Sequence, residues 1–403
     1  MSARPLPAPP SPSRHRRITR VLINGLHAKS GGGVTYLRNI VPHLADDPRL
    51  ELHLFLHVDQ SALFLPVDER VRVHLLDFRS SFWRRLLWEQ VCLPFRARAI
   101  SADVTFSPAN FGPLFVRNAV ILLRNAIAVG NAERRLGKRL YWMGLTLMTA
   151  ASLLACRRAI AVSAYARDAL TFGSKRRAAC KISIVHHGAD ERFAPGTADH
   201  EEGRPFLLAV SDIYVQKNFH TLIRALPKIR ARVPGLTLRI AGRPVDGDYF
   251  RDLQAIVAHE GLSDAVEFLG SQPLERLIAL YRGCAVFVFP STVETFGNPL
   301  VEAMRCGAAI ACSNTTAMPE VVGDAALLFD PVDADDMARR IIEILTDPVG
   351  AAVLRGRAIE QGRRYSWAKT ARKTADVLIG AAGNDNHAPL TATGQLHSRN
   401  RAK

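Results

Sequence analysis

The stretch from Ala285 to Ser313 constrains the fold of this chain more than any other. It reads AVFVFPSTVETFGNPLVEAMRCGAAIACS, and its two ends are short apolar runs that predict buried strands. Between them, Asn298 is an N-cap residue type and Pro299 suits the first position of a helix, which we expect to end at Gly307. This order indicates a βαβ unit. The loop before its helix faces the carboxyl end of the sheet, where open α/β folds bind ligands.

Two carboxylates belong to this unit. Glu294 lies in the loop, and Glu302 follows eight positions later, in the first turn of a helix capped by Asn298. The free N–H groups of that turn and the helix dipole favour an anion such as a diphosphate. Carboxylates beside an anion are better suited to accept hydrogen bonds from hydroxyl groups. We therefore expect the two glutamates to bind a sugar and a ribose attached to the diphosphate.

The motif Glu294-Thr-Phe-Gly-Asn-Pro-Leu-Val-Glu302 resembles the E-x(7)-E element of retaining GT-B glycosyltransferases, in the form typical of glycosyltransferase family 4. The resemblance implies that Glu294 contacts the donor sugar and Glu302 the nucleotide ribose. It also implies donor contacts from the residues between them, Phe296, Gly297, Asn298 and Leu300. The alternative is a surface glutamate plus a glutamate favoured by the helix dipole alone. The F-G pair, the Asn-Pro cap and both flanking strands favour the motif.

The length of 403 residues predicts two domains. Apolar runs predict further strands at 20–26, 50–58, 71–76, 102–106, 119–123, 159–163, 182–185, 206–210, 236–241 and 325–329. The expected fold class is α/β, GT-B, with two Rossmann-like domains that face each other across a cleft. We expect a disordered basic tail over residues 1–17, an acceptor domain over 18–195, a donor domain over 204–365, a helix over 366–383 that packs back on the first domain, and a disordered tail over 384–403.

A formal charge of +16, from 53 basic and 37 acidic residues, implies an anionic partner: a nucleotide, an anionic lipid surface or a nucleic acid. The basic residues form no dense tract with interleaved aromatics, so no specific nucleic acid is expected. Six cysteines without C-x-x-C pairing indicate reduced thiols, and residues 1–17 are too polar for a secretory segment. We expect a cytoplasmic protein, with peripheral contact to the inner membrane face as a further expectation.

A glycine run follows the first predicted strand. Gly31, Gly32 and Gly33 precede an apolar helix face, a layout that lets backbone approach a phosphate. Members of the family carry a glycine pair here that reaches the donor diphosphate. In the second domain Lys217 precedes a helix for which Asn218 is the expected cap, and a lysine there can reach a phosphate as a compact charge.

The chain departs from the family pattern at two places. Where members read V-G-R-x(4)-K, this chain has Val210-Ser211-Asp212 and keeps Lys217, so the resemblance implies donor contacts from Ser211 and Lys217 with one cation fewer. Where many members read His-Asp, it has Arg124-Asn125, so no catalytic histidine is carried over. We expect Arg124 and Asn125 at the cleft, and the alternative for Arg124 is an arginine at a strand end.

His186 and His187 begin a turn similar to the family's N-G-V-D. Adjacent residues of a strand point to opposite faces, so the two histidines do not form a metal site together; we expect His187 to line the cleft. Asp246-Gly247-Asp248 matches the D-x-D metal signature of another glycosyltransferase fold, but its Gly/Pro-containing loop favours a solvated turn. Residues 315–324 are expected to form a loop.

Two further segments are apolar enough to need a partner surface. Residues 81–98 mix four arginines with apolar residues, namely Trp83, Leu86, Leu87, Trp88 and Val91. We expect an amphipathic helix that packs on its own sheet. Contact with a membrane surface or a lipid-linked acceptor is the alternative. Tyr141 to Cys156 is 16 residues without a charge, short of the roughly 20 that span a bilayer, and predicts a buried or interfacial helix.

The resemblance implies a retaining transfer of a hexose from a nucleoside-diphosphate sugar to a glycan or lipid-linked acceptor. It also implies a role in bacterial envelope polysaccharide or lipopolysaccharide synthesis. Glu294 and Lys217 would carry the chemistry, and neither a cofactor nor a metal is expected. The alternatives are another GT-B enzyme, such as a phosphorylase or epimerase, and a non-enzymatic protein that binds anionic lipid or nucleic acid. The donor base, the sugar, the acceptor and the linkage stay open.

Overall fold

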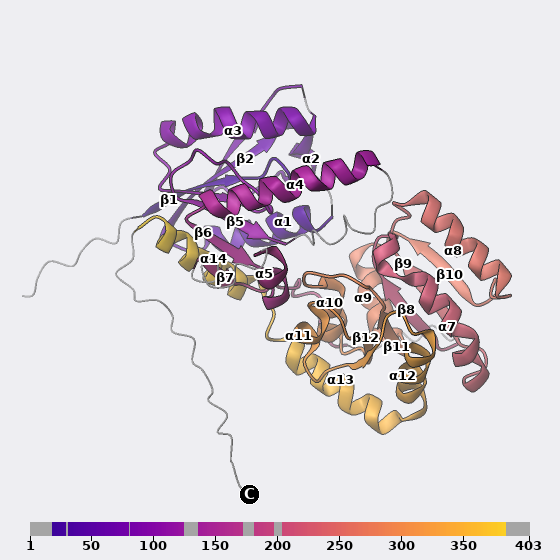
Figure 1. The fold of residues 1–403 in the computed structure, drawn as a ribbon. Coiled ribbons are helices and arrows are strands. Elements are labelled where there is room, and N and C mark those ends of the chain that lie inside the picture. Colours follow the sequence, from indigo (N-terminus) through magenta and orange to yellow (C-terminus); the bar gives the residue numbers. More distant parts are fainter. Residues whose placement is uncertain are drawn as a thin grey trace, which may run out of the picture.

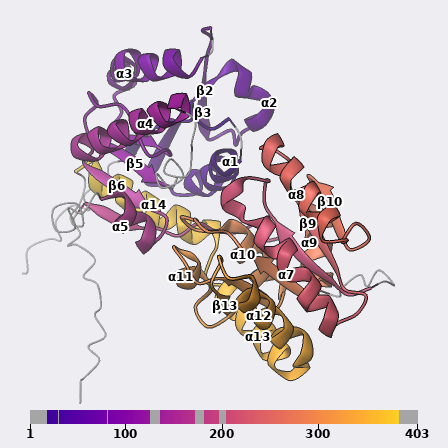
Figure 2. The same cartoon turned by 45° about the vertical axis from the view of Figure 1, so that its right-hand side comes forward.

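The computed structural model describes residues 18–29, 31–79, 81–124, 136–171, 181–196 and 204–383, and side chains of the fourth range from Met143 on. It contains two parallel sheets, each with helices on both faces (Figures 1 and 2). The strand order is β3-β2-β1-β4-β5-β6-β7 in the first sheet and β10-β9-β8-β11-β12-β13 in the second. Two Rossmann-like α/β domains are thereby confirmed. The predicted tails, like Asn125, lie outside the described residues.

The first sheet consists of β1 (Thr19–Asn24), β2 (Leu50–His57), β3 (Val71–Leu76), β4 (Val104–Ser107), β5 (Ala119–Leu123), β6 (Arg158–Ala161) and β7 (Ile182–Ile184). Its helices are α1 (Gly32–Ala45), α2 (Ser61–Phe64), α3 (Phe82–Ala99), α4 (Leu136–Ala155) and α5 (Ala164–Leu170). All of its strand pairs are parallel. Its central strands are continuous apolar runs because both faces of a parallel sheet are covered.

The second sheet consists of β8 (Phe206–Val210), β9 (Thr237–Ala241), β10 (Val266–Gly270), β11 (Val286–Phe289), β12 (Ile310–Ser313) and β13 (Leu327–Phe329). Its helices are α7 (Phe219–Arg232), α8 (Gly247–His259), α9 (Leu274–Gly283), α10 (Asn298–Cys306), α11 (Met318–Val322), α12 (Ala334–Thr346) and α13 (Pro348–Gly362). The predicted βαβ unit is confirmed as β11, α10 and β12, with Gly307 as a left-handed C-cap.

Three local predictions were wrong. The N-cap of α10 is Gly297, not Asn298, because the loop enters the helix through a left-handed residue (φ 89°) that favours glycine. The D-x-D sequence is a helix start rather than a free turn, since Asp246 caps α8 by accepting from Tyr249 N. The segment 315–324 contains α11, which begins with Met318 and Pro319.

The last described helix, α14 (Trp367–Ala381), leaves the second domain and packs against α1 of the first (Figure 1). It starts where Ser366 bridges Ala189. The backbones are so close that a Cβ on Gly188 would lie 2.2 Å from Trp367 N. Only glycine fits between them, so Gly188 fixes the path by which the chain returns to the first domain.

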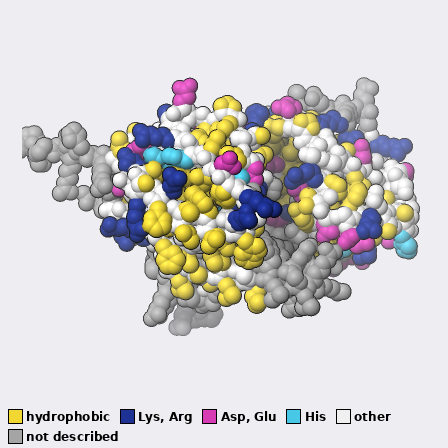
Figure 3. All heavy atoms as spheres, turned by 90° about the horizontal axis from the view of Figure 1, so that it is seen from above, with side chains coloured by type: hydrophobic (Ala, Val, Ile, Leu, Met, Phe, Trp, Pro, Cys, Tyr) yellow, Lys and Arg dark blue, Asp and Glu magenta, His cyan; other side chains and the backbone are white. Residues whose placement is uncertain are grey.

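Helix α3 packs on its own sheet as predicted, through Leu93 and Ala97, but it also presents a row of apolar side chains to solvent. Trp83, Leu87, Val91 and Phe95, four residues apart, are 67%, 64%, 51% and 65% exposed, whereas Arg85 and Glu89 are buried. Figure 3 shows hydrophobic side chains gathered on the face of the first domain seen from above, with Lys and Arg at its margin.

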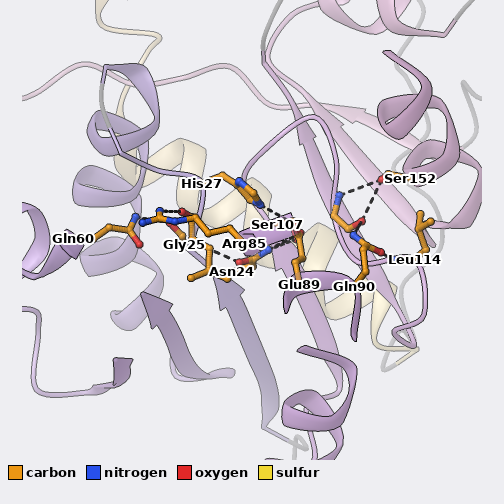
Figure 4. A network of polar contacts seen from close by, with 12 residues as sticks. Asn24, Gly25, His27, Gln60, Arg85, Glu89, Gln90, Ser107, Leu114 and Ser152 are labelled. Carbon is orange, nitrogen blue, oxygen red and sulfur yellow. Dashed lines mark hydrogen bonds and ion pairs between the residues drawn. The ribbon is translucent and has the colours of Figure 1, made fainter. Parts of the chain in front are cut away.

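Arg85 and Glu89 face inward because each finds polar partners there (Figure 4). Arg85 donates to Leu26 O (2.7 Å). The fully buried Glu89 accepts from Asn24 Nδ2 and pairs with His27 Nε2, both at 2.7 Å. A buried charge is tolerated only with such partners, so this network just beyond the carboxyl end of β1 fixes how α3 lies on the sheet.

Gly188→Ala tests the close packing of the Gly188 backbone against the start of α14. The added methyl meets backbone atoms that cannot rotate away, so we expect a loss of about 3 kcal/mol in the free energy of unfolding. Gly356→Ala, in α13 with no atom near its Cβ position, should leave stability unchanged or raise it by about 0.4–1 kcal/mol. Urea denaturation measures both. A Gly188→Ala variant as stable as the parent would contradict the close packing.

Candidate active site

The loop after β11 joins the two domains. Thr295 Oγ1 donates to the carbonyl of Arg124, just beyond β5 (2.5 Å). The carbonyl of Thr295 accepts from Ser163 Oγ, the N-cap of α5 (2.6 Å). The loop that carries Glu294 is therefore fixed against the ends of β5 and β6, where the carboxyl edges of the two sheets meet.

Lys217 and Glu294 form an ion pair in this loop region. Lys217 Nζ donates to Glu294 Oε1 at 2.5 Å, and both side chains are mostly buried. Lys217 ends a 3-10 turn (Val215–Lys217) after β8. Thr316 Oγ1 accepts from the Glu294 amide. The structure thus brings together the two residues to which the sequence assigns the chemistry, 77 positions apart in the chain.

Glu302 lies in a different environment from Glu294. Because α10 begins at Asn298, Glu302 is in its second turn rather than the first. Its Oε2 accepts from the Tyr281 hydroxyl of α9 at 3.0 Å. Burial raises the pKa of Glu302 to about 7, partly offset by that hydrogen bond. Near neutral pH this carboxyl group is therefore close to half protonated.

The residues between the two glutamates serve mainly to build the loop. Phe296 is buried and stacks near His186 and His187. Leu300 is fully buried, and its amide donates to Gly297 O (3.0 Å). Asn298 turns away from its helix, and its Oδ1 lies 3.1 Å from His187 Nδ1. Loop shape, rather than side-chain chemistry, is what Phe296, Gly297 and Leu300 supply.

The two histidines both reach the second domain. His186 Nε2 lies 2.9 Å from Glu320 Oε1. His187 is buried beside Tyr36 and Trp367, and burial lowers its pKa to about 4, so its ring is neutral at pH 7. With Nδ1 donating to Asn298, its Nε2 is a buried acceptor that has no partner among the described residues.

The glycine loop and Arg124 lie together on the first domain. Gly31 is the N-cap of α1 with φ 55°, and no side chain caps this helix. A Cβ on Gly33 would lie 2.6 Å from Arg124 Nη2, and one on Gly32 would lie 3.7 Å from Nη1. The expected place of Arg124 at the cleft agrees with this geometry, since its backbone also holds Thr295 of the second domain.

The negative charge of Asp212 is compensated by a neighbouring arginine. Its carboxylate pairs with Arg243, which follows β9, at 2.7 Å, and the Arg243 amide donates to the same carboxylate. The amide of Ser211 donates to Ala241 O. Gly242 is needed beside it, because a Cβ there would lie 1.9 Å from Ser211 O. The loops after β8 and β9 are thereby tied together.

Sequence analysis missed three residues that join the domains. Thr295 and Ser163 are described above, and Glu320 of α11 accepts from the amides of Ala164 and Tyr165 at the start of α5 (2.9 and 3.3 Å). Their partners are 132 to 171 positions away. Only the serine before α5, an N-cap residue type, carries a local signal.

Two further findings bear on the choice of site. Among the residues that the structure describes, no three His, Cys, Asp or Glu side chains are grouped to hold a metal ion. A cavity of about 650 Å³ lies at the opposite, amino ends of β8 and β11, and its lining includes Arg204, Arg276 and Cys284 but no predicted site residue. The candidate site is thus the junction of the carboxyl edges.

The family model described as glycosyl transferases group 1 matches residues 190–365, which hold the second sheet, Lys217 and both glutamates. This range begins within the His-His-Gly-Ala-Asp turn and ends just before α14.

Relatives of this domain include two Escherichia coli proteins. The chain is 36% identical over 167 residues to the serotype-specific mannosyltransferase WbdA, which is 41% of this chain and 20% of WbdA. It is 35% identical over 177 residues to O-antigen chain mannosyltransferase B, which is 43% of this chain and 45% of that protein. The chain therefore matches less than half the length of each.

Solved structures match nearly the whole chain. Sucrose-phosphate synthase from Thermosynechococcus elongatus has a TM-score of 0.75 at 18% identity, over 91% of this chain and 100% of that one. Anabaena HepE in complex with UDP-glucose has a TM-score of 0.71 at 18% identity, over 90% and 99%. WaaG, a glycosyltransferase involved in lipopolysaccharide biosynthesis, has 0.70 at 13%, over 89% and 100%. These likenesses show that the fold is GT-B.

Glu302→Gln tests the buried carboxyl. Because the native pKa of about 7 exceeds the ordinary 4.5, the folded protein binds more protons than the unfolded one between these values. Stability is therefore lost as pH rises from 4.5 through 7, by about 3 kcal/mol in total. Glutamine does not titrate, so the free energy of unfolding of the variant relative to that of the parent should be higher at pH 8 than at pH 5. Urea denaturation at both pH values measures this. An equal difference at both pH values would contradict the raised pKa.

Proposed function

We propose that this protein is a retaining glycosyltransferase of family 4 that moves a hexose from a nucleoside-diphosphate sugar to a glycan or lipid-linked acceptor. The observation that carries the proposal is the pair Lys217–Glu294 in a loop that Thr295 ties to the first domain. A cation suited to a phosphate and a carboxylate suited to sugar hydroxyls lie there at the ends of both sheets.

In the proposed reaction, the bond from the anomeric carbon to the phosphate oxygen breaks, and a bond from the acceptor oxygen forms on the same face. The departing phosphate oxygen takes the acceptor's proton, so no side-chain base is required. Lys217 and the N–H groups at the starts of α1 and α10 stabilise the charge that develops on the diphosphate. Glu294 orients the sugar, and Glu302 accepts from the ribose hydroxyls in place of the Tyr281 hydroxyl.

The comparisons support the donor class and the setting. HepE was solved with UDP-glucose, which favours a nucleotide sugar as donor. WbdA and mannosyltransferase B are named for mannosyl transfer, and this favours a hexose. We propose that the product belongs to a bacterial envelope polysaccharide or lipopolysaccharide, made in the cytoplasm.

The exposed face of α3 supports work at a membrane surface. Trp83, Leu87 and Phe95 are exposed there, together with Met143, Leu147 and Leu154 of α4, which lies on the same side of the first sheet (Figures 1 and 2). Glu89, the one acidic residue of α3, is buried, while Arg84, Arg96 and Arg98 are exposed. An apolar face rimmed by arginine suits an anionic lipid surface. No described helix is long and apolar enough to cross a bilayer.

Glu294→Gln tests the transfer itself. It keeps the shape of the side chain but removes the charge that accepts from the sugar hydroxyls, so we expect kcat/KM to fall about tenfold to a hundredfold. Nucleotide release and sugar transfer from candidate donors measure this. Glu267→Gln, at an exposed position of β10, is the matched control and should transfer at the parent rate. A folded Glu294→Gln protein with parent activity would contradict the proposal.

The membrane contact is tested by replacing Trp83, Leu87 and Phe95 together with serine. Because exposed apolar side chains supply the binding energy, the triple variant should no longer sediment with phosphatidylglycerol vesicles, while its transfer to a soluble acceptor is unchanged.

The control for this test is the serine triple variant at Val332, Val349 and Val353, which are exposed valines of the second domain. It should sediment like the parent. Parent-like sedimentation of the α3 variant would show that this face is not the docking surface.

A further inference from the structure

Arg124 is a cation with no counter-ion among the residues that the structure describes. Its guanidinium has no hydrogen bond or ion pair to any residue that the structure describes, and its Nε is buried without a partner. Burial lowers the pKa of Arg124. The Tyr36 phenol acts in the opposite direction, but it is itself buried and neutral. A buried charge in this state is costly unless a partner arrives.

The backbone holds this side chain in place from both domains. The Arg124 amide donates to Asn110 Oδ1 (2.8 Å), and its carbonyl accepts from Thr295 Oγ1 (2.5 Å). The strand end that carries the guanidinium is therefore fixed. The guanidinium lies against the glycine loop, since a Cβ on Gly33 would lie 2.6 Å from Nη2 and would have to displace it.

The guanidinium lies beside the positive end of a helix. Helix α1 is 14 residues long, has no acidic residue in its first turn and no side-chain cap, so its first N–H groups lack intrahelical partners. A cation at this end repels the helix dipole. His187, which also interacts electrostatically with Arg124, is neutral at pH 7, so it neither repels nor compensates the guanidinium. An anion between the helix start and the guanidinium would satisfy both groups.

We propose that Arg124, beside the start of α1, binds the diphosphate of the donor. The first domain would then supply a cation that the second domain lacks, since Asp212 stands where the family pattern has an arginine. This inference rests on the proposed function. Lys217 acts together with the opposite charge of Glu294, and Arg243 with that of Asp212, so each of these pairs is neutral as a whole. Arg124 adds a positive charge to them, and its guanidinium can donate two parallel hydrogen bonds to a phosphate.

The test compares Arg124→Ala, Arg124→Lys and, as a control, Arg38→Ala, an exposed arginine of α1. The probes are inorganic pyrophosphate, the nucleoside diphosphates UDP, GDP and ADP, and the matching nucleosides, with affinities from calorimetric titration. Arg124→Ala should weaken pyrophosphate and the cognate diphosphate about tenfold to a hundredfold and leave nucleoside binding unchanged. Lysine should restore part of the loss, and Arg38→Ala should bind like the parent.

A second measurement separates this role from a structural one. Without ligand, Arg124→Ala should melt at the same temperature as the parent or higher, because it removes an uncompensated buried charge. A marked fall in melting temperature, or parent-like affinity for pyrophosphate and diphosphate, would overturn the proposal. An Arg124→Ala variant whose KM rises only for the acceptor would also overturn the proposal, since Arg124 would then bind an anionic group of the acceptor rather than the donor diphosphate.

The two proposals fail in different ways. If the parent binds a nucleoside diphosphate through Arg124 but transfers no sugar from any donor, the proposed function fails and the anion site stands. If the parent transfers sugar and Arg124→Ala does so with unchanged donor affinity, the function stands and the role of Arg124 falls.

Discussion

The site depends on the two hydrogen bonds of Thr295. Its hydroxyl donates to the carbonyl of Arg124 and its own carbonyl accepts from Ser163, so one residue of the second domain is held by two segments of the first. The loop that carries Glu294 has this shape only while the domains are docked. Gly188 and α14 reinforce the docking from the other side. Separate domains would each hold half of a donor site.

Charge is almost fully paired at this junction, although the chain carries a formal charge of +16. Lys217 faces Glu294, Arg243 faces Asp212, and His186 faces Glu320. Burial keeps His187 neutral and Glu302 partly protonated. A diphosphate entering such a site meets preorganised polar groups rather than a general positive surface. The surplus of basic side chains lies elsewhere, in part along the exposed face of α3.

Local signals account for what the sequence predicted. The strands β8, β11 and β12 are continuous apolar runs, and Lys217 and Glu294 are recognisable from spacing and family resemblance. Strand β10 escaped prediction because its residues are only partly buried. The burial of Arg85 and Glu89 on helix α3 was not predicted, since the partners that bury them lie about 60 positions away. Contacts across domains, such as those of Thr295 and Glu320, leave no pattern in a single sequence.

The central claim is that the junction of the two sheets binds a nucleoside diphosphate. Thermal unfolding of the parent protein with UDP, GDP and ADP, their sugars and their monophosphates tests this directly. One diphosphate, at about 100 times its dissociation constant, should add about 2.7 kcal/mol to the free energy of unfolding, and its monophosphate should add clearly less at the same concentration. No stabilisation by any member of the panel, or equal stabilisation by the monophosphate, would contradict the account.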